Sequence, residues 1–356
     1  MSPGGSALPA TYVVRAGSAQ RDRDAVIAVW RGNLGREDRL AAKYDWFYLG
    51  CPFGQPLLQV MRHEPTATPV GVAAAGPRRM LAGGVELGAG VLVDMAVTAE
   101  HRSLGPALML QKKMMAAGIE RFDLLYGFPN PKAAPVFKRV GYSELAPLVR
   151  YARVLRYAGH LERLMPAAAA RPLGWLLDGA TRAWQEVAAR RGRAPRWHAR
   201  WADRVDPRMD ELWARSDHGT EPIAARDLAM LRWRFDEAPL PKTRYLLLSD
   251  PSGRELQAWF ACEADGSTLH VRDFWSVDGA QGVGQSFIAA LLQAARTAGH
   301  SSVSVEYAGP VHRRAPWLDA GFIARTRRQV FVKWRDAATG GDSRSDLHLT
   351  SADEDE

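Results

Sequence analysis

The second half of the chain repeats a series of landmarks from the first half, in the same order. Six residues separate Trp46 from Pro52, and six separate Trp233 from Pro239. The pairs Asp94 with Arg102, Asp273 with Gln281, Phe137 with Gly141-Tyr142, and Trp317 with Gly321-Phe322 keep the same register. Self-similarity over this length predicts two lobes of the same fold. A chain of 356 residues is also longer than one hydrophobic core usually supports.

Each half alternates between strand and helix patterns. Apolar runs with β-branched residues predict strands, and apolar residues at helical spacing predict helices. In the first half the strands are expected at 12–14, 57–60, 70–74, 91–97 and 124–128, and the helices at 22–33, 106–121 and 131–139. We therefore expect an α/β fold.

Composition shifts divide the chain further. We expect a flexible N-terminal arm at 1–10, a first lobe at 11–155, a helical basic connector at 156–199, a second lobe at 200–335 and an acidic flexible tail at 336–356. The segment from Leu145 to Leu155 is expected to close the first lobe as a long strand. Within the tail, Leu347 to Leu349 could instead add a short edge strand.

The net charge and the cysteine content limit which cellular compartment and which binding partners we expect. The net charge of +8 favours anionic partners, such as a phosphate-bearing cofactor, without choosing among them. Two distant cysteines, Cys51 and Cys262, indicate reduced thiols, and no apolar run reaches membrane-spanning length. We expect a cytoplasmic protein. The Arg- and Trp-rich connector could present a basic surface to RNA or anionic lipid, or it could be a solvated helix with buried tryptophans.

The passage that indicates chemistry is the strand Val91 to Val97, followed by a glycine-containing turn at the start of a long helix. Backbone N–H groups at a helix start have no helical partners, and the helix dipole favours negative charge there. A pyrophosphate therefore fits this turn, and Gly105 would let it approach closely.

The residues of this turn resemble a known family. Arg102-x-x-Gly105-x-Ala107 matches the Q/R-x-x-G-x-G/A coenzyme-A signature of the GNAT acyltransferase superfamily, and Asn130-x-x-x-Ala134-x-x-Phe137-x-x-x-Gly141-Tyr142 is similar to its second signature. The resemblance implies a mixed, mostly antiparallel twisted sheet in each lobe, with splayed central strands flanked by helices. It also implies acetyl-CoA or another acyl-CoA as co-substrate, with no metal.

The resemblance further implies which residues hold the cofactor. The pantetheine arm would bond the backbone of Met95 and Val97 and lie between these residues and Asn130 and Phe137. The pyrophosphate would lie on the loop formed by Arg102, Ser103, Leu104, Gly105, Pro106 and Ala107. Pro106 takes one N–H away from this loop.

Direct acyl transfer needs a base for the acceptor and can use an acid for the leaving thiolate. Asp94 is the candidate base, because burial in an apolar strand would raise its pKa. Asp94 could instead be a structural residue that caps a loop or pairs with an arginine. Many members of the family carry a tyrosine acid where this chain has Phe137, so Tyr142 or Tyr126 is the candidate acid, unless a water supplies the proton or the thiolate leaves unassisted. Glu100 and His101 are expected at the solvated surface.

The second lobe keeps Gln281-x-x-Gly284-x-Ser286 but has Pro310 at the position of Asn130. We expect it to be structural or substrate-shaping, with Asp273 and Trp275 lining an acceptor cleft between the lobes. The expected function is acyl transfer to an amine or hydroxyl of a small-molecule or sugar-linked acceptor, and a nucleic-acid partner is not expected. A tRNA-dependent aminoacyl transferase, a non-catalytic acyl-CoA sensor and a homodimer remain alternatives.

Overall fold

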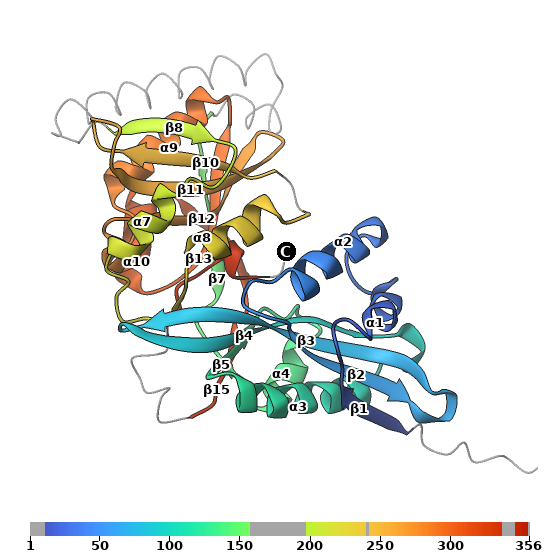
Figure 1. Cartoon of the computed structure of the whole chain (residues 1–356). Coiled ribbons are helices and arrows are strands. Elements are labelled where there is room, and N and C mark those ends of the chain that lie inside the picture. The colour runs from blue at the N-terminus through green and yellow to red at the C-terminus, as the bar shows by residue number, and fades with distance from the viewer. Residues whose placement is uncertain (1–10, 157–196, 240–241, 337–345, 355–356) are drawn as a thin grey trace, which may run out of the picture.

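Two eight-stranded sheets form the frame of the protein in the computed structural model, which describes residues 11–156, 197–239, 242–336 and 346–354 (Figure 1). The first sheet has the order β1-β2-β3-β4-β5-β15-β6, with β9 paired to β3, and the second has the order β14-β7-β13-β12-β11-β10-β8, with β16 paired to β13. The strands of the first sheet are β1 (Tyr12–Ala16), β2 (Leu57–His63), β3 (Thr68–Ala82), β4 (Val85–Val97), β5 (Leu124–Gly127), β6 (Ser143–Glu144), β9 (Ile223–Ala224) and β15 (Phe331–Trp334). Those of the second are β7 (Leu148–Val154), β8 (His198–Ala202), β10 (Arg244–Ser249), β11 (Leu256–Asp265), β12 (Thr268–Ser276), β13 (Ser302–Ala308), β14 (Ile323–Arg328) and β16 (Leu349–Thr350).

Helices cover the faces of both sheets. The α-helices are α1 (Arg23–Trp30), α2 (Leu40–Tyr44), α3 (Leu104–Arg121), α4 (Ala134–Val140), α7 (Arg208–Arg215), α8 (Leu228–Leu231), α9 (Gln285–Thr297) and α10 (Val311–Asp319). The shorter helical turns are η1 (Glu37–Arg39), η2 (Asp45–Leu49), η3 (Glu64–Thr66), η4 (Ala99–His101), η5 (Arg232–Asp236), η6 (Gly279–Gln281) and η8 (Ser351–Asp353). Mixed sheets flanked by helices confirm the expected α/β fold with two sheets.

Each half of the chain contributes to the sheet of the other half: the first half places β7 in the second sheet, and the second half places β9 and β15 in the first. β7 lies between β13 and β14, with Tyr151 opposite Val305, and β15 lies between β5 and β6, with Val332 opposite Tyr126. The prediction that Leu145 to Leu155 closes the first lobe was therefore wrong. A period-two pattern identifies a strand and its buried face, but it does not identify the strand's partner. The lobe boundaries at 155 and 200 remain a prediction, and three strands pair with the sheet of the other half.

The repeated Trp landmarks meet at the centre of the molecule. Trp46 of η2 and Trp233 of η5 are stacked, with ring centroids 5.0 Å apart. Each indole N–H donates to the backbone oxygen of the other tryptophan, at 2.7 and 3.1 Å. The reciprocal bonds show that the two landmarks are related as a pair across the junction of the lobes, and not only along the sequence.

The two faces of the first sheet carry different helices. Buried residues of α1, α2 and η2 pack with Val72, Ala74 and Val93 on one face. Buried residues of α3 and α4 pack with Ala73, Ala75 and Leu92 on the other. Because β3 alternates between the two clusters residue by residue, the sheet separates them. This separation decides which candidate site residues can meet.

The acidic end of the chain is buried over residues 347–354, where we expected a mobile tail. His348, Thr350 and Asp353 are all at most 1% exposed, and this red segment lies between the sheets in Figure 1. The expectation failed because the acidic residues find buried arginine partners, such as Arg226 for Asp353. The suggested edge strand at Leu347 to Leu349 corresponds to β16 at Leu349–Thr350. Residues 337–345 and 355–356 lie outside the described part of the chain.

Two features are absent from the described residues. No helix among them is both long enough and apolar enough to cross a membrane. In the same ranges no cluster of His, Cys, Asp and Glu could hold a metal ion. The basic connector falls mainly on residues 157–196, which lie outside the described ranges, so its surface remains a prediction.

Candidate active site

The loop between β4 and α3 is open on the side where an anion would bind. α3 begins at Leu104, and its preceding residue, Ser103, makes no side-chain hydrogen bond to the first turn. A Cβ added at Gly105 would meet no atom within 4 Å, and residues 102–105 are exposed. The N–H groups at this helix start can therefore be reached from solvent. Pro106 is buried and contributes none.

Arg102 is held against the protein and does not extend over the loop. Its Nε donates to the backbone oxygen of Val97 at 3.3 Å, and its Nη2 donates to Oδ1 of Asn33 at the end of α1. This side chain fixes the loop relative to β4. In this arrangement it does not replace the N–H that Pro106 lacks.

β4 and β5 separate next to this loop. Their parallel pairing runs from Ala89 with Leu124 to Leu92 with Gly127 and then ends, although β4 continues to Val97. β5 itself ends at Gly127. Met95 and Val97, the predicted pantetheine partners, lie on the part of β4 beyond its last pair with β5, so β5 does not pair with their backbone, as the expected splay requires.

The second signature supports the helix that follows the splay. Oδ1 of Asn130 accepts the backbone N–H groups of Lys132 and Ala133, both at 3.0 Å, in the turn that leads into α4. Phe137 is buried against Tyr142 and Phe331, with ring centroids 5.0 and 5.6 Å apart. These positions give both residues a role in holding α4 in place beside the splay.

Tyr142 lies in the core between the first sheet and α3, and its phenol oxygen accepts a hydrogen bond from Gln111 at 3.2 Å. Burial raises the pKa of this phenol well above its usual value. Asp94 contacts residues of the opposite face. The structure therefore does not bring Tyr142 and Asp94 together. Tyr126 is fully buried, and its phenol donates to the backbone oxygen of Asp353 at 3.0 Å.

Asp94 lies at a bulge in β4, opposite Ala73, where the pairing with β3 shifts register. Its φ of 53° is in the left-handed region, which costs energy for a residue other than glycine. Strained backbone of this kind concentrates at functional sites, because surrounding structure must be built to hold it. The strain supports the choice of Asp94 as a site residue.

Two donors hold the carboxylate of Asp94. Lys43 Nζ of α2 lies 2.8 Å from Oδ1, and the phenol of Tyr48 donates to Oδ2 at 3.0 Å. The alternative expected from the sequence was a structural arginine, and the partners seen here are a lysine and a tyrosine. Sequence reasoning did not select Lys43 or Tyr48, although Tyr48 lies two residues after the landmark Trp46.

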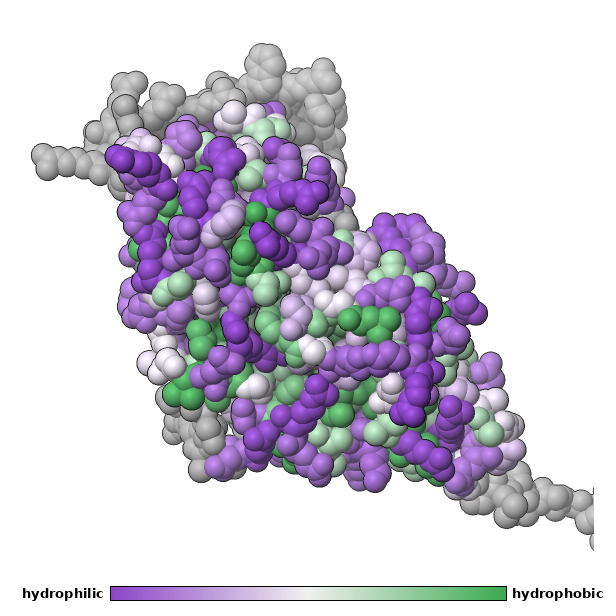
Figure 2. Space-filling model, in the orientation of Figure 1, coloured by the Kyte–Doolittle hydropathy of each residue, from purple (hydrophilic) through white to green (hydrophobic). Residues whose placement is uncertain are grey.

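A cavity of about 220 Å³ opens beside Asp94 at the junction of the lobes. Its walls combine apolar and basic side chains from α1, α2 and the loop between them with one residue of the second half. The lining residues are Trp30, Leu34, Gly35, Arg36, Arg39, Leu40, Lys43, Trp46, Asp94 and Pro239. The face of the molecule shown in Figure 2 is largely hydrophilic, with hydrophobic side chains scattered over it in small groups.

The counterpart of Asp94 has a different environment. Asp273 is 2% exposed, and its carboxylate lies 3.3 Å from Nε of Arg226. Trp275 is 1% exposed, and its Nε1 donates to Ser216. The expectation that Asp273 and Trp275 line an acceptor cleft was therefore wrong, because the C-terminal segment covers them.

Asp273 makes a test of this burial possible. Its pKa is raised by burial and by the nearby Asp353, although Arg226 opposes the shift. The folded protein thus keeps this proton at a pH where the unfolded chain has lost it. The stabilisation is complete below the ordinary aspartate pKa of about 3.9 and is lost as the pH rises through the folded pKa. Relative to Asp273→Asn, the wild type should lose about 1–3 kcal/mol of unfolding free energy between about pH 4 and 7, measured by urea denaturation. If the unfolding free energies of the two proteins changed with pH in parallel, the raised pKa could not be assigned to Asp273.

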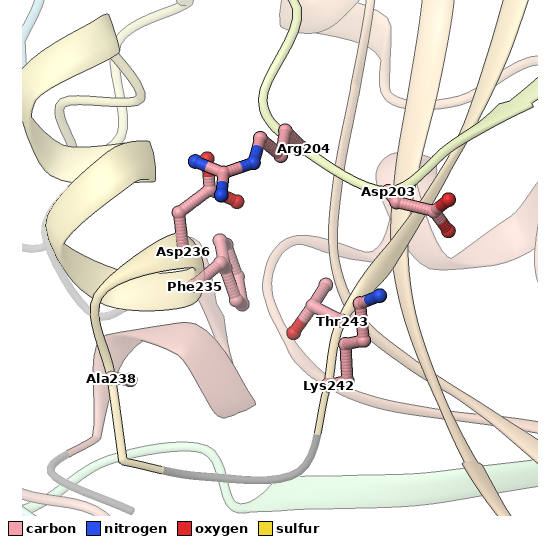
Figure 3. A pocket seen from close by; sticks show the side chains of 7 residues that line it. All are labelled: Asp203, Arg204, Phe235, Asp236, Ala238, Lys242 and Thr243. Carbon is pink, nitrogen blue, oxygen red and sulfur yellow. The ribbon is translucent and has the colours of Figure 1, made fainter.

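A second cavity, of about 260 Å³, lies within the second lobe (Figure 3). Acidic and basic side chains from the turn after β8, the end of η5 and the start of β10 line it. The carboxylate of Asp236 already accepts hydrogen bonds from the Val205 N–H at 3.1 Å and from Tyr245 at 2.8 Å. This cavity lacks the splayed strands and the open helix start found in the first lobe.

Comparison with known proteins identifies the fold. No protein-family model matches the chain, and no curated protein sequence matches it either. Among solved structures, the chain is similar to a conserved protein of unknown function from Enterococcus faecalis V583, described as a probable N-acyltransferase, with a TM-score of 0.63 and 11% identity over 93% of this chain and 74% of that one. It is also similar to GCN5-related N-acetyltransferases from Anabaena variabilis (TM-score 0.61, 12% identity, 94% and 75% covered) and Kribbella flavida (0.59, 12%, 94% and 74%). The chain therefore has the fold of the GNAT superfamily, built as two tandem lobes.

Proposed function

We propose that this protein transfers an acyl group, by default acetyl, from coenzyme A to an amine or hydroxyl of a small-molecule or sugar-linked acceptor. The reaction takes place in the first lobe. The observation that carries the proposal is that three features adjoin one another along β4: the splay from β5, the open helix start at Gly105, and the cavity at Asp94.

The donor occupies the splay and the loop. The pantetheine arm bonds the backbone of Met95 and Val97, where β4 has lost its β5 neighbour. The pyrophosphate lies on residues 102–107, where the N–H groups of Leu104 and Gly105 and the helix dipole favour negative charge. The thioester then lies near the bulge at Asp94, between the cofactor and the cavity.

The acceptor enters through the cavity at the lobe junction. Its nitrogen or oxygen attacks the thioester carbon, backbone N–H groups at the bulge stabilise the oxyanion, and the C–S bond breaks to release the coenzyme A thiolate. Asp94 takes the proton of the acceptor. No protein acid is assigned to the thiolate, because Phe137 has no proton to give and the phenol of Tyr142 lies in the core.

A second candidate function is an acyl-CoA sensor without catalysis. The observation that favours it is the ion pair between Asp94 and Lys43, since a carboxylate with two donors is a weaker proton acceptor. A sensor would bind acyl-CoA and turn over no acceptor. The tRNA-dependent alternative depends on the connector, most of which lies outside the described residues.

The test of the cofactor site is calorimetric titration with acetyl-CoA. The wild type should bind one equivalent, and Gly105→Asp should weaken binding at least about 100-fold, because a carboxylate would repel the pyrophosphate at close range. The new side chain has open space around it, so the fold should be retained.

The matched control is Gly284→Asp, at the corresponding position of the second lobe, which should leave the affinity unchanged. Wild-type protein that does not bind acetyl-CoA would refute the proposed function. Equal loss of affinity in the two variants would refute the assignment of the site to the first lobe.

A further inference from the structure

The C-terminal segment at 346–354 lies between the strands of the second lobe that correspond to the splayed strands of the first. We propose that the cleft between β12 and β13 is a binding site for an extended peptide, filled by this segment of the chain itself. The second lobe then has a peptide ligand where the first lobe has room for a cofactor, and the protein takes up one acyl-CoA per chain.

The backbone pairing places the segment in the cleft. β12 and β13 pair in parallel from Thr268 with Ser302 to Val271 with Val305, and their pairing then ends, as it does between β4 and β5. Beyond that point β16 pairs antiparallel with Tyr307 and Ala308 of β13. On the other side, the hydroxyl of Ser351 donates to the backbone oxygen of Arg272 in β12 at 3.1 Å. The segment therefore contacts both strands of the splay.

Buried charges anchor the segment. Asp353 accepts the N–H of Thr350 at 2.7 Å and Nη2 of Arg226 at 2.8 Å. The hydroxyl of Thr350 donates to Asp273 at 3.0 Å, and Arg226 also pairs with Asp273. Arg226, Asp273 and Asp353 are each at most 2% exposed. An ion-pair cluster buried this deeply is strongly destabilised when one member is lost, so the docked position is specific.

Apolar and aromatic contacts fill the rest of the cleft. Leu347 and Leu349 are 2% and 1% exposed. Nδ1 of the His348 ring lies 3.1 Å from the phenol oxygen of Tyr307 and 3.2 Å from Nη1 of Arg313. Burial and the two nearby arginines, Arg226 and Arg313, hold the pKa of His348 well below its usual value, so the ring is neutral and the Arg313 guanidinium donates to its Nδ1.

The turn before α9 in the second lobe packs against α10. Arg313 of α10 donates from Nε to the backbone oxygen of Ala280 at 3.0 Å. A Cβ added at Gly282 would lie 3.0 Å from Cα of Arg313, whereas one added at Gly284, the counterpart of Gly105, would meet only Phe287 at 3.9 Å. In the second lobe the space between β12 and β13 is therefore occupied by protein, while the start of α9 is not covered at Gly284.

The docked segment also contacts the first lobe. The backbone oxygen of Asp353 accepts the phenol of Tyr126 on β5, and Glu354 pairs with Arg328. Nη2 of Arg78 on β3 lies 3.5 Å from the backbone oxygen of Glu354. The segment thus joins the second cleft to the wall of the first lobe.

Hydrogen exchange of the full chain, followed by mass spectrometry with and without acetyl-CoA, tests the proposal. Amides of residues 347–352 and of Tyr307 and Ala308 should be protected as strongly as the strands of the core. Acetyl-CoA should slow exchange at 93–107 and leave 272–286 and 347–352 unchanged. Protection by acetyl-CoA at 272–286, with release of 347–352, would overturn the proposal, and so would exchange of 347–352 at the rate of a free peptide.

The same experiment separates this proposal from the proposed function. If acetyl-CoA changes exchange nowhere while 347–352 remains protected, the acyl-CoA function fails and the peptide cleft stands. Asp353→Asn, which removes one charge of the cluster, should speed exchange of 347–352 at least tenfold, with protection of 93–107 by acetyl-CoA retained. The control is Asp346→Asn, a substitution in the same segment outside the cluster, which should leave the exchange of 347–352 unchanged. Equal effects of the two substitutions would contradict the anchoring role of Asp353.

Discussion

Arg226→Met should lower the free energy of unfolding by about 3–5 kcal/mol, because it leaves the buried carboxylates of Asp273 and Asp353 without their shared cation. The arginine is 2% exposed and also donates to the backbone oxygen of Ala224 at 2.5 Å. Methionine has a similar volume, so the effect comes mainly from the charge and not from a cavity. Urea denaturation at pH 7 measures this change in the free energy of unfolding. At that pH both carboxylates are ionised in the unfolded chain.

The matched substitution is Arg244→Met, which removes an arginine from an ion pair with Asp203 in which both side chains are more than half exposed. It should cost less than about 1 kcal/mol, because exposed pairs contribute little. A similar small cost for Arg226→Met would show that the C-terminal segment is not docked in solution. A large cost for both would indicate that the second lobe tolerates no change of this kind.

The strands that each half contributes to the sheet of the other half predict how a loss of stability in one lobe affects the other lobe. β7 is covered on one side by β13 and on the other by β14, so the second lobe cannot unfold without releasing a segment continuous with the first. The Trp46–Trp233 stack and the C-terminal segment add further contacts across the junction. We therefore expect a single unfolding transition in these experiments, even though the chain has two sheets.

The sequence predicted the two lobes and the strand, turn and helix start of the candidate donor site, because these depend on local patterns. A strand followed by a glycine turn and a helix start is encoded within residues 91–121, and its structure follows from that stretch alone. The equal spacing of Trp46 to Pro52 and of Trp233 to Pro239 also predicted that the two tryptophans occupy corresponding positions. Their side chains lie in contact.

The sequence did not predict features that depend on pairing between distant segments. An acidic, Gly- and Ser-rich end is typical of a solvated segment, unless a buried cation elsewhere in the fold pairs with it. The sequence around Arg226 has no pattern that predicts the burial of that arginine. The strands that pair with β7 and β15 could not be predicted from the sequence either, because any strand edge offers the same backbone groups. Lys43 could not be selected for the same reason, since 51 residues separate it from Asp94.

Asp94 and Asp273 occupy corresponding positions in the two lobes, but their environments differ. Both aspartates lie on the fourth long strand of their sheet, near a register shift, but only Asp94 has a left-handed backbone and only Asp94 lines a cavity. Asp273 has regular pairing with Ala261 and a buried arginine. A catalytic role, which needs access for an acceptor, is therefore expected at Asp94 alone.

Asp94→Asn should lower turnover of an acceptor by about 10²–10⁴-fold, because an amide cannot take the proton that a carboxylate takes. Asparagine keeps the size of the side chain and tolerates the left-handed backbone better than most residues, so the bulge should be preserved. Acetyl-CoA affinity, measured by calorimetry, should change little. Steady-state rates of coenzyme A release at saturating acetyl-CoA give the turnover.

The control for this prediction is Asp273→Asn, which makes the same chemical change at the corresponding position of the second lobe. It should alter the pH dependence of stability and leave the turnover number within about twofold, since Asp273 is covered by the C-terminal segment and does not contact either substrate. Full turnover in Asp94→Asn would remove Asp94 as the base while leaving the cofactor site intact. If acetyl-CoA binds to the wild type and no amine or hydroxyl acceptor is ever turned over, the ion pair of Asp94 with Lys43 is the resting structure of a sensor, and Asp94→Asn should then change only the acyl-CoA affinity.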